Sequence, residues 1–148
     1  MQIWVDADAC PKVIKEIILK AGKRTQTCVT FVANQAIALP VSPLFKMLIV
    51  PGGFDVADQK ICDLVQPNDL VITADIPLAH DVVMKNAFAL NPRGMLYTHN
   101  NVKQVLSIRN ISESVRNAGI RTQGPDKFST RDIQSFANHL DRFLQMHK

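Results

Sequence analysis

The chain of 148 residues contains only three cysteines, Cys10, Cys28 and Cys62, and no CxxC pair. An odd number with this spacing is unsuited to a disulfide framework or a cysteine-rich zinc site, and it favours a reducing compartment. The four histidines also lack the spacing of metal ligands. The few aromatic residues, 6% of the chain, are not interleaved with basic residues as in proteins that stack unpaired bases.

A long apolar run is also missing. The uncharged stretch 25–45 contains threonine, asparagine, glutamine, serine and two prolines, so it does not qualify as a membrane span. The first residues do not show a basic region followed by an apolar core, as a signal peptide would. We therefore expect a cytoplasmic protein with no membrane association.

The overall composition indicates a folded protein. Hydrophobic residues make up 47% of the chain and charged residues 20%, which suits one compact domain over residues 1–148. The formal net charge of +4 is compatible with an anionic partner such as RNA, without requiring one.

Apolar runs alternate with amphipathic segments along most of the chain. The apolar runs predict strands at 2–5, 28–33, 46–50, 70–73 and 87–90. The amphipathic segments predict helices from Pro11 to a stop at Gly22, over 55–65, over 77–86 and after a capping box at Ser129 and Asp132. The chain after Gly94 is expected to be mainly helical, with a periodic stretch from Val102 to a stop at Gly119 and a loop over 122–127. Strands alternating with helices predict a three-layer α/β domain with a mainly parallel central sheet flanked by helices.

Acidic residues follow two of the predicted strands. Asp6 and Asp8 come after the first strand and Asp75 after the fourth, and ligands of parallel sheets bind at the carboxyl ends of the strands. Asp55 and Asp58 are three residues apart at a helix start, so their side chains point to the same side. Clustered carboxylates repel one another unless a hard cation such as Mg²⁺ or Mn²⁺ neutralises them, and such a cation indicates phosphate chemistry.

Local structure explains the same acids almost equally well. Asp6 and Asp8 have the residue types of a turn and of an N-cap for the helix beginning near Pro11. Asp75 alone is typical of a cap, and acids in a first helical turn are favoured by the helix dipole. On spacing alone, both interpretations stay open.

Other side chains with chemical potential are scattered. Cys10 precedes Pro11 at a helix N-terminus, a position that lowers a thiol pKa and could make a nucleophile. The preferred interpretation is an unreactive buried cysteine, because no histidine is near in sequence to act as a base and buried cysteines are more common than reactive ones. Basic side chains suited to phosphate contacts are Arg93, Arg109, Arg116, Arg121, Lys127 and Arg131.

Five segments together resemble the signature of a known family. They are VDADACP at 5–11, DVAD at 55–58, TADIPLA at 73–79, NPRG at 91–94, and Gly124-Pro125 with Phe128-Ser129 and Asp132. In this order they resemble the YaiI/YqxD family of bacterial proteins, and the match spans nearly the whole chain. That family is grouped by resemblance with PIN-like domains, many of which are metal-dependent ribonucleases.

The resemblance implies a PIN-like domain with an acidic pocket that binds Mg²⁺ or Mn²⁺ at the edge of the sheet. Its implied catalytic residues and metal ligands are Asp6, Asp58 and Asp75, with Asp8 and Asp55 as auxiliary ligands. Its implied substrate is RNA, for which the expected contacts are Arg93, Arg121 and Lys127. The last acid of the usual PIN quartet has only Asp81 as a substitute here, which weakens the case for catalysis more than the case for metal binding.

Three functions remain open from the sequence. The first is a metal-dependent phosphodiesterase acting on RNA, and the second is a non-catalytic RNA- or protein-binding module on the same scaffold. The third is a haloacid-dehalogenase-like phosphatase with Asp6 as nucleophile. It ranks below the others because Ala9-Cys10-Pro11 replaces the expected hydroxyl residue and the chain leaves little room for a cap domain.

Overall fold

The computed structural model describes residues 1–52, 56–104 and 129–147. Its strands are β1 (Ile3–Asp6), β2 (Val29–Ala33), β3 (Phe45–Ile49), β4 (Leu70–Ile72), β5 (Phe88–Leu90) and β6 (Leu96–Tyr97). Its helices are α1 (Lys12–Thr25), α2 (Val56–Leu64), α3 (Ile76–Met84) and α5 (Thr130–Met146), with a 3₁₀ turn, η1 (Ala7–Ala9), directly after β1.

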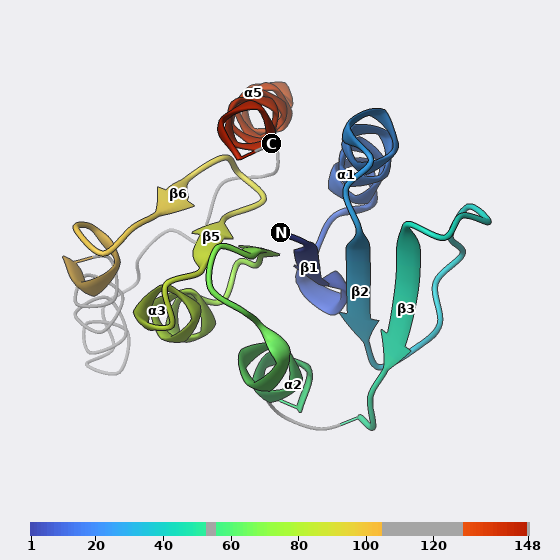
Figure 1. Cartoon of the computed structure of the whole chain (residues 1–148), viewed down its shortest axis with the longest axis horizontal. Helices are drawn as coiled ribbons and strands as arrows, with labels where there is room; N and C mark the ends of the chain where they lie inside the picture. The colour runs from blue at the N-terminus through green and yellow to red at the C-terminus, as the bar shows by residue number, and fades with distance from the viewer. Residues whose placement is uncertain (53–55, 105–128, 148) are drawn as a thin grey trace, which may run out of the picture.

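The six strands form one sheet in the order β3-β2-β1-β4-β5-β6. Every neighbouring pair is parallel except β5 and β6, which are antiparallel. Helices α1 and α5 cover one face of the sheet and α2 and α3 cover the other (Figure 1). The predicted three-layer α/β architecture is confirmed. None of the described helices is long and apolar enough to cross a membrane.

The central strand β1 divides its side chains between the two faces of the sheet. Ile3 and Val5 are fully buried in the core under α1 and α5, whereas Trp4 belongs to the core under α2 and α3. This alternation is the period-2 pattern of a strand buried on both sides. By the same alternation, Asp6 faces the α2 and α3 side of the sheet.

Helix α1 does not stop at Gly22 as predicted, but continues to Thr25 and ends on Gln26 in the left-handed conformation. Gly22 is buried inside the helix, where an added Cβ would lie 3.0 Å from Cγ2 of Val29 and 3.1 Å from the ring of Phe45. The glycine therefore allows the helix to pack closely on β2 and β3, which is a tertiary requirement rather than a stop signal.

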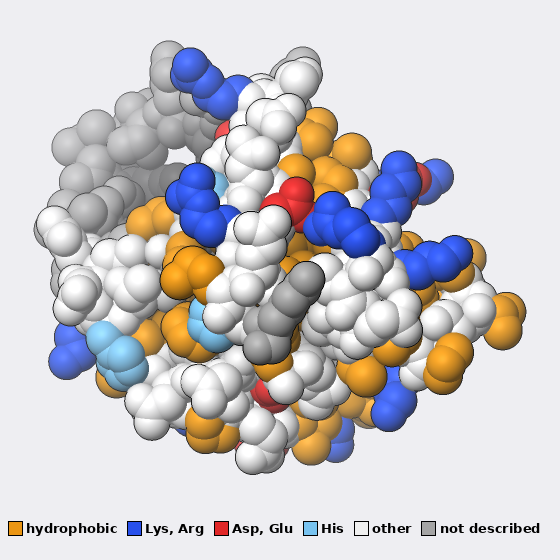
Figure 2. All heavy atoms as spheres, turned by 45° about the horizontal axis from the view of Figure 1, so that its top comes forward, with side chains coloured by type: hydrophobic (Ala, Val, Ile, Leu, Met, Phe, Trp, Pro, Cys, Tyr) orange, Lys and Arg blue, Asp and Glu red, His pale blue; other side chains and the backbone are white. Residues whose placement is uncertain are grey.

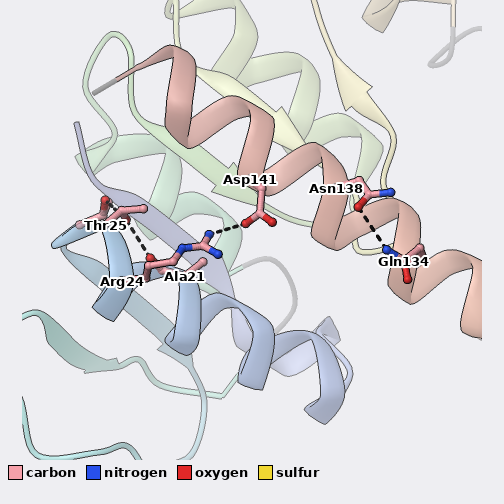
Figure 3. Close-up of polar contacts among 7 residues, drawn as sticks. Ala21, Arg24, Thr25, Gln134, Asn138 and Asp141 are labelled. Atoms are coloured by element: carbon pink, nitrogen blue, oxygen red, sulfur yellow. Dashed lines mark hydrogen bonds and ion pairs between the residues drawn. The ribbon is translucent and has the colours of Figure 1, made fainter.

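Helix α5 begins as predicted. The Ser129 hydroxyl accepts from the backbone N–H of Asp132, and the Asp132 carboxylate accepts from the backbone N–H of Ser129, which completes the capping box. Helices α1 and α5 lie side by side, and the Arg24 guanidinium donates to the Asp141 carboxylate between them (Figure 3).

The prediction of a mainly helical chain after Gly94 missed one strand, because Leu96 and Tyr97 form β6 against β5. Two residues are too few for a periodic pattern to be recognised in sequence. The turn before β6 is closed by Gly94, whose N–H donates to the carbonyl of Asn91 at 2.8 Å and whose φ is +99°. The helical pattern predicted from Val102 to Gly119 begins as expected, since residues 102–104 are helical; its remainder and the predicted loop over 122–127 lie outside the described residues.

Candidate functional site

The strand order predicts a ligand-binding crevice at the carboxyl ends of β1 and β4. The chain leaves β1 toward β2 and β3 on one side, and it leaves β4 toward β5 and β6 on the other. Such a reversal point, at the carboxyl ends of parallel strands, is where open α/β sheets bind ligands. Asp6 is the last residue of β1 and Thr73 directly follows β4, so these two residues flank the crevice.

Asp6 is held from across this crevice by Thr73. The Asp6 side chain is buried, with 6% of the residue exposed, and its Oδ2 accepts from the Thr73 hydroxyl at 3.2 Å. The same hydroxyl oxygen accepts from the backbone N–H of Asp75 at 3.0 Å. Because a hydroxyl has a single proton, that proton is directed at Asp6.

Four of the predicted acids act on one another at this position. Burial raises the pKa of Asp6 most, and the charges of Asp75 and Asp8 raise it further. The Thr73 hydroxyl and the Asp58 carboxyl, which lies within hydrogen-bonding reach, lower the pKa of Asp6. A buried carboxylate among other acids must either keep a proton or be neutralised by a cation.

The structure decides between capping and other roles for two of these acids. Asp8 does not cap α1, whose N-cap is Pro11 without a side-chain hydrogen bond; its Oδ2 instead accepts from the N–H of Asn34, just after β2, at 3.0 Å. Asp75 does cap α3, because its Oδ1 accepts from the N–H of Leu78 at 2.8 Å. Capping was therefore a wrong interpretation of Asp8 and a confirmed one of Asp75.

The acids fit a hard cation in chemical type, since Mg²⁺ and Mn²⁺ prefer oxygen ligands. Within the described part of the chain, the groups that act on the buried Asp6 carboxylate are the Thr73 hydroxyl and other acids, without a cationic side chain. Within the described ranges, however, no group of three or more histidine, cysteine, aspartate or glutamate side chains is arranged closely enough to hold a metal ion. The predicted auxiliary ligand Asp55 lies outside the described residues.

The predicted phosphate contact Arg93 is engaged with helix α5. Its Nη1 donates to Oδ2 of Asp132 at 2.6 Å, and its backbone N–H donates to Oδ1 of Asn91 at 2.8 Å. The pKa of Asp132 is lowered chiefly by the backbone N–H of Ser129, with further help from the Ser129 hydroxyl and from Arg93. The other two predicted contacts, Arg121 and Lys127, lie outside the described residues.

Asp81, the possible substitute for a further acid, lies on α3 with its side chain 61% exposed. Its Oδ1 is 3.2 Å from Nδ1 of the neighbouring His80. It does not contribute to the shifted pKa of Asp6.

Two residues near the acids escaped prediction as parts of the site. Thr73 was visible as the first residue of the TAD segment, but nothing in the pattern distinguished its hydroxyl. Tyr97 gave no signal, although it is 2% exposed and its hydroxyl accepts from Nδ2 of Asn91 at 3.0 Å. Burial raises the pKa of Tyr97, the Asn91 hydrogen bond opposes this, and the charge of Asp75 adds to it. Tyr97 is therefore within electrostatic reach of the acidic residues.

Cys10 is a buried cysteine and not a reactive thiolate, in agreement with the interpretation that the sequence favoured. The residue is buried, and burial raises the pKa of its thiol to about 12, against a lowering by the ammonium of Lys15 and with a further increase from Asp6. A thiol with this pKa stays protonated at neutral pH and is a poor nucleophile.

A second buried carboxylate, Asp69, lies at the opposite, amino edge of the sheet. Its Oδ1 accepts from the N–H of Gln2 at 3.1 Å, and its Oδ2 accepts from Nε1 of Trp4 at 3.0 Å and from the N–H of Gln66 at 2.9 Å. Asp69 directly precedes β4 in the turn Pro67-Asn68-Asp69, a pattern that does not distinguish a buried carboxylate from an ordinary turn residue. Its three donors make it a structural link between β1 and β4.

Comparisons with known proteins agree with the family signature. Residues 4–146 match the family model described as "Uncharacterized BCR, YaiI/YqxD family". A UPF0178 protein of Shewanella amazonensis is 56% identical over 144 residues, which cover 97% of each chain. UPF0178 proteins of Proteus mirabilis and Burkholderia cenocepacia are each 53% identical, covering 100% and 99% of this chain and 98% of the relatives. No solved structure matches the chain.

Proposed function

The chain belongs to the YaiI/YqxD family, and we propose that it is a metal-dependent phosphodiesterase that hydrolyses RNA. One observation carries the proposal. The buried carboxyl of Asp6 lies at the reversal point of the sheet, where Asp8, Asp58 and Asp75 all act on its pKa. Carboxylates brought together in this way are suited to a divalent cation and, through it, to a phosphate group.

In the proposed reaction, a water oxygen bonds to phosphorus as the bond from phosphorus to the leaving oxygen breaks. One proton of that water ends on the leaving oxygen, so the products are a phosphate monoester and a free hydroxyl. A bound Mg²⁺ or Mn²⁺ would neutralise the carboxylates and lower the pKa of that water. Asp6, Asp58 and Asp75 would hold the cation, with Asp8 and Asp55 as auxiliary ligands. The Thr73 hydroxyl keeps the Asp6 carboxylate turned toward the crevice.

The choice of RNA rests on charge and on the family's resemblance to PIN-like domains. The chain carries 17 lysines and arginines against 13 aspartates and glutamates, which favours a polyanionic substrate. Arg93, Arg121 and Lys127 are the proposed phosphate contacts. A cytoplasmic location, also proposed, would give the protein access to such a substrate.

Purified full-length protein incubated with labelled single-stranded RNA and Mn²⁺ tests the proposal. We expect cleavage that EDTA stops and that Asp6→Asn abolishes, because the substitution removes the buried charge at the centre of the site. Asp81→Asn is the matched control, since Asp81 is an exposed acid paired with His80. Cleavage that survives Asp6→Asn would come from a contaminating nuclease and would contradict the proposal.

A second candidate function is a non-catalytic RNA- or protein-binding module on the same fold. It is favoured by the finding that the acids among the described residues do not form a group that could hold a metal ion. This candidate predicts binding of RNA or of a protein partner without turnover at any Mn²⁺ concentration. Phosphate retained covalently on Asp6 would instead identify the phosphatase mechanism considered from the sequence.

A further inference from the structure

A groove of about 410 Å³ lies between helix α1 and the segment that follows β2. Its lining includes Lys12, Lys15, Glu16 and Leu19 from the helix, and Ile37 and Leu39 from the segment. Lys15 and Glu16 are each three or four residues from both Lys12 and Leu19, so the four positions form one continuous stripe along α1.

The groove lies next to the acidic residues of the candidate site. The hydrogen bond from the N–H of Asn34 to Asp8 fixes the start of the segment that forms one wall. On the other wall, Lys12 begins α1 and is separated from Asp8 by only three residues. A ligand in the groove would therefore extend toward Asp8.

The lining combines positive charge with apolar surface. Lys12 is exposed and Lys15 half-buried, and neither forms an ion pair within the described part of the chain, where Glu16 is the one acid lining the groove. Leu19, Ile37 and Leu39 supply the apolar wall. The face covered by α1 and α5 also carries many lysine and arginine side chains and few acidic ones (Figure 2).

We propose that this groove binds a segment of single-stranded RNA beside the acidic site. Lys12 and Lys15 contact backbone phosphates, and a base or ribose packs against Leu19 and Ile37. The choice of RNA rests on the proposed function; the position of the strand rests on the groove itself. A single strand fits better than a duplex, because the faces of duplex bases are stacked and cannot reach an apolar wall.

RNA binding is measured separately from cleavage, by fluorescence anisotropy of a short fluorescein-labelled single-stranded RNA. EDTA is present and every protein carries Asp6→Asn, so that the RNA is not cleaved during the measurement. The Lys12→Gln/Lys15→Gln variant should bind more weakly. The slope of log association constant against log salt should become shallower by about 1.4, since each phosphate contact of a single strand contributes about 0.7. The matched control, Lys20→Gln/Lys23→Gln, removes two exposed lysines of the same helix that do not line the groove.

The outcomes separate this inference from the proposed function. A salt slope changed equally by both double variants, equal competition by duplex RNA, or no RNA binding at all would overturn the groove assignment, whatever the cleavage assay shows. Binding that depends on Lys12 and Lys15 supports the groove even if Mn²⁺ gives no cleavage, a result that would contradict only the proposed function.

Discussion

The Thr73 hydroxyl donates to Oδ2 of Asp6 at 3.2 Å, and this bond joins the end of β4 to the end of β1. It opposes the effect of burial, because it lowers the pKa of Asp6 while burial and the neighbouring acids raise it. Thr73 is itself 1% exposed and accepts from the N–H of Asp75, so the hydroxyl cannot turn to water instead. In the proposed enzyme, Thr73 is a positioning residue that favours the ionised form of Asp6.

Thr73→Val should weaken Mn²⁺ binding while leaving the fold intact, because valine keeps the shape and β-branching of threonine but loses the donor. Partners of metal ligands are typically worth about 10- to 100-fold in affinity, so we expect a loss of at least about tenfold by titration calorimetry. Thr73→Ser is the matched control and should retain most of the affinity. Equal Mn²⁺ binding by the valine and serine variants would show that the hydroxyl does not prepare Asp6 for the metal.

Asp6→Asn should stabilise the metal-free protein at neutral pH. The folded pKa of Asp6 lies above its ordinary value of 3.8, so the native state holds the proton more tightly than the unfolded chain does. Ionisation therefore costs stability as pH rises above 3.8 and through the folded pKa, and the asparagine variant escapes this cost. Urea unfolding in EDTA at pH 7 should show a gain of about 0.5–2 kcal/mol, the usual range for a single stabilising substitution.

Two controls accompany that measurement. The gain should shrink to nothing below pH 3.8, where the carboxyl is protonated in both states, and a gain that persists there would have another cause. Saturating Mn²⁺ should reverse the order at neutral pH, since a ligand of the native state at 100 times its Kd adds about 2.7 kcal/mol to the wild type alone.

Asp69→Ala should destabilise the protein without changing Mn²⁺ affinity. The substitution leaves the N–H groups of Gln2 and Gln66 and Nε1 of Trp4 without their acceptor. Only the Trp4 bond is buried, and an orphaned buried donor costs about 1–3 kcal/mol. The two part-buried N–H groups can turn partly to water and add less, so we expect a loss of about 1–3 kcal/mol in urea unfolding. Trp4→Phe removes one donor but leaves the Asp69 carboxylate bonded to its other two donors. It should therefore lower the free energy of unfolding by less than Asp69→Ala does. A stable Asp69→Ala variant would refute the structural role of this carboxylate.

Acid should weaken the start of helix α5 through Asp132. Its folded pKa lies below the ordinary 3.8, so its contribution is complete above 3.8 and disappears as pH falls through the folded pKa. Urea unfolding of wild type and Asp132→Asn should differ by a constant amount at neutral pH and converge in strong acid. Asp141→Asn is the comparison: the Arg24 and Asp141 side chains are 60% and 45% exposed, and such surface pairs contribute about 0–1 kcal/mol. A difference in unfolding free energy between wild type and Asp132→Asn that stays the same down to strong acid would show that the charge of Asp132 does not stabilise the start of α5.

The sequence predicted the fold well where a segment's own residues determine its structure. The buried strands β1, β2 and β4 read as short apolar runs, and the capping box of α5 is a local pattern at Ser129 and Asp132. The sequence did not predict features that depend on contacts between residues far apart in the chain. Gly22 is a glycine because β2 and β3 pack against it, and β6 exists because β5 offers a free edge to Leu96 and Tyr97.

The candidate site divides in the same way. Asp6 and Asp75 could be placed at one edge because parallel strands end together, and that rule needs only the order of elements. The partners that determine their chemistry could not be placed. The contact between Thr73 and Asp6 spans 67 residues and the one between Asn34 and Asp8 spans 26, and neither spacing has a sequence signature.

Strand β1 is the first to be synthesised and yet lies in the middle of the sheet, between β2 and β4. On the ribosome it can pair with β2 early, but its other edge stays open until Leu70 to Ile72 have emerged. An open apolar edge is a template for pairing with other chains, so a product of interrupted translation that ends before β4 should be prone to aggregation. Its Asp6 would also lack the Thr73 hydroxyl, so that partly made chains would accumulate as insoluble material without a formed acidic crevice.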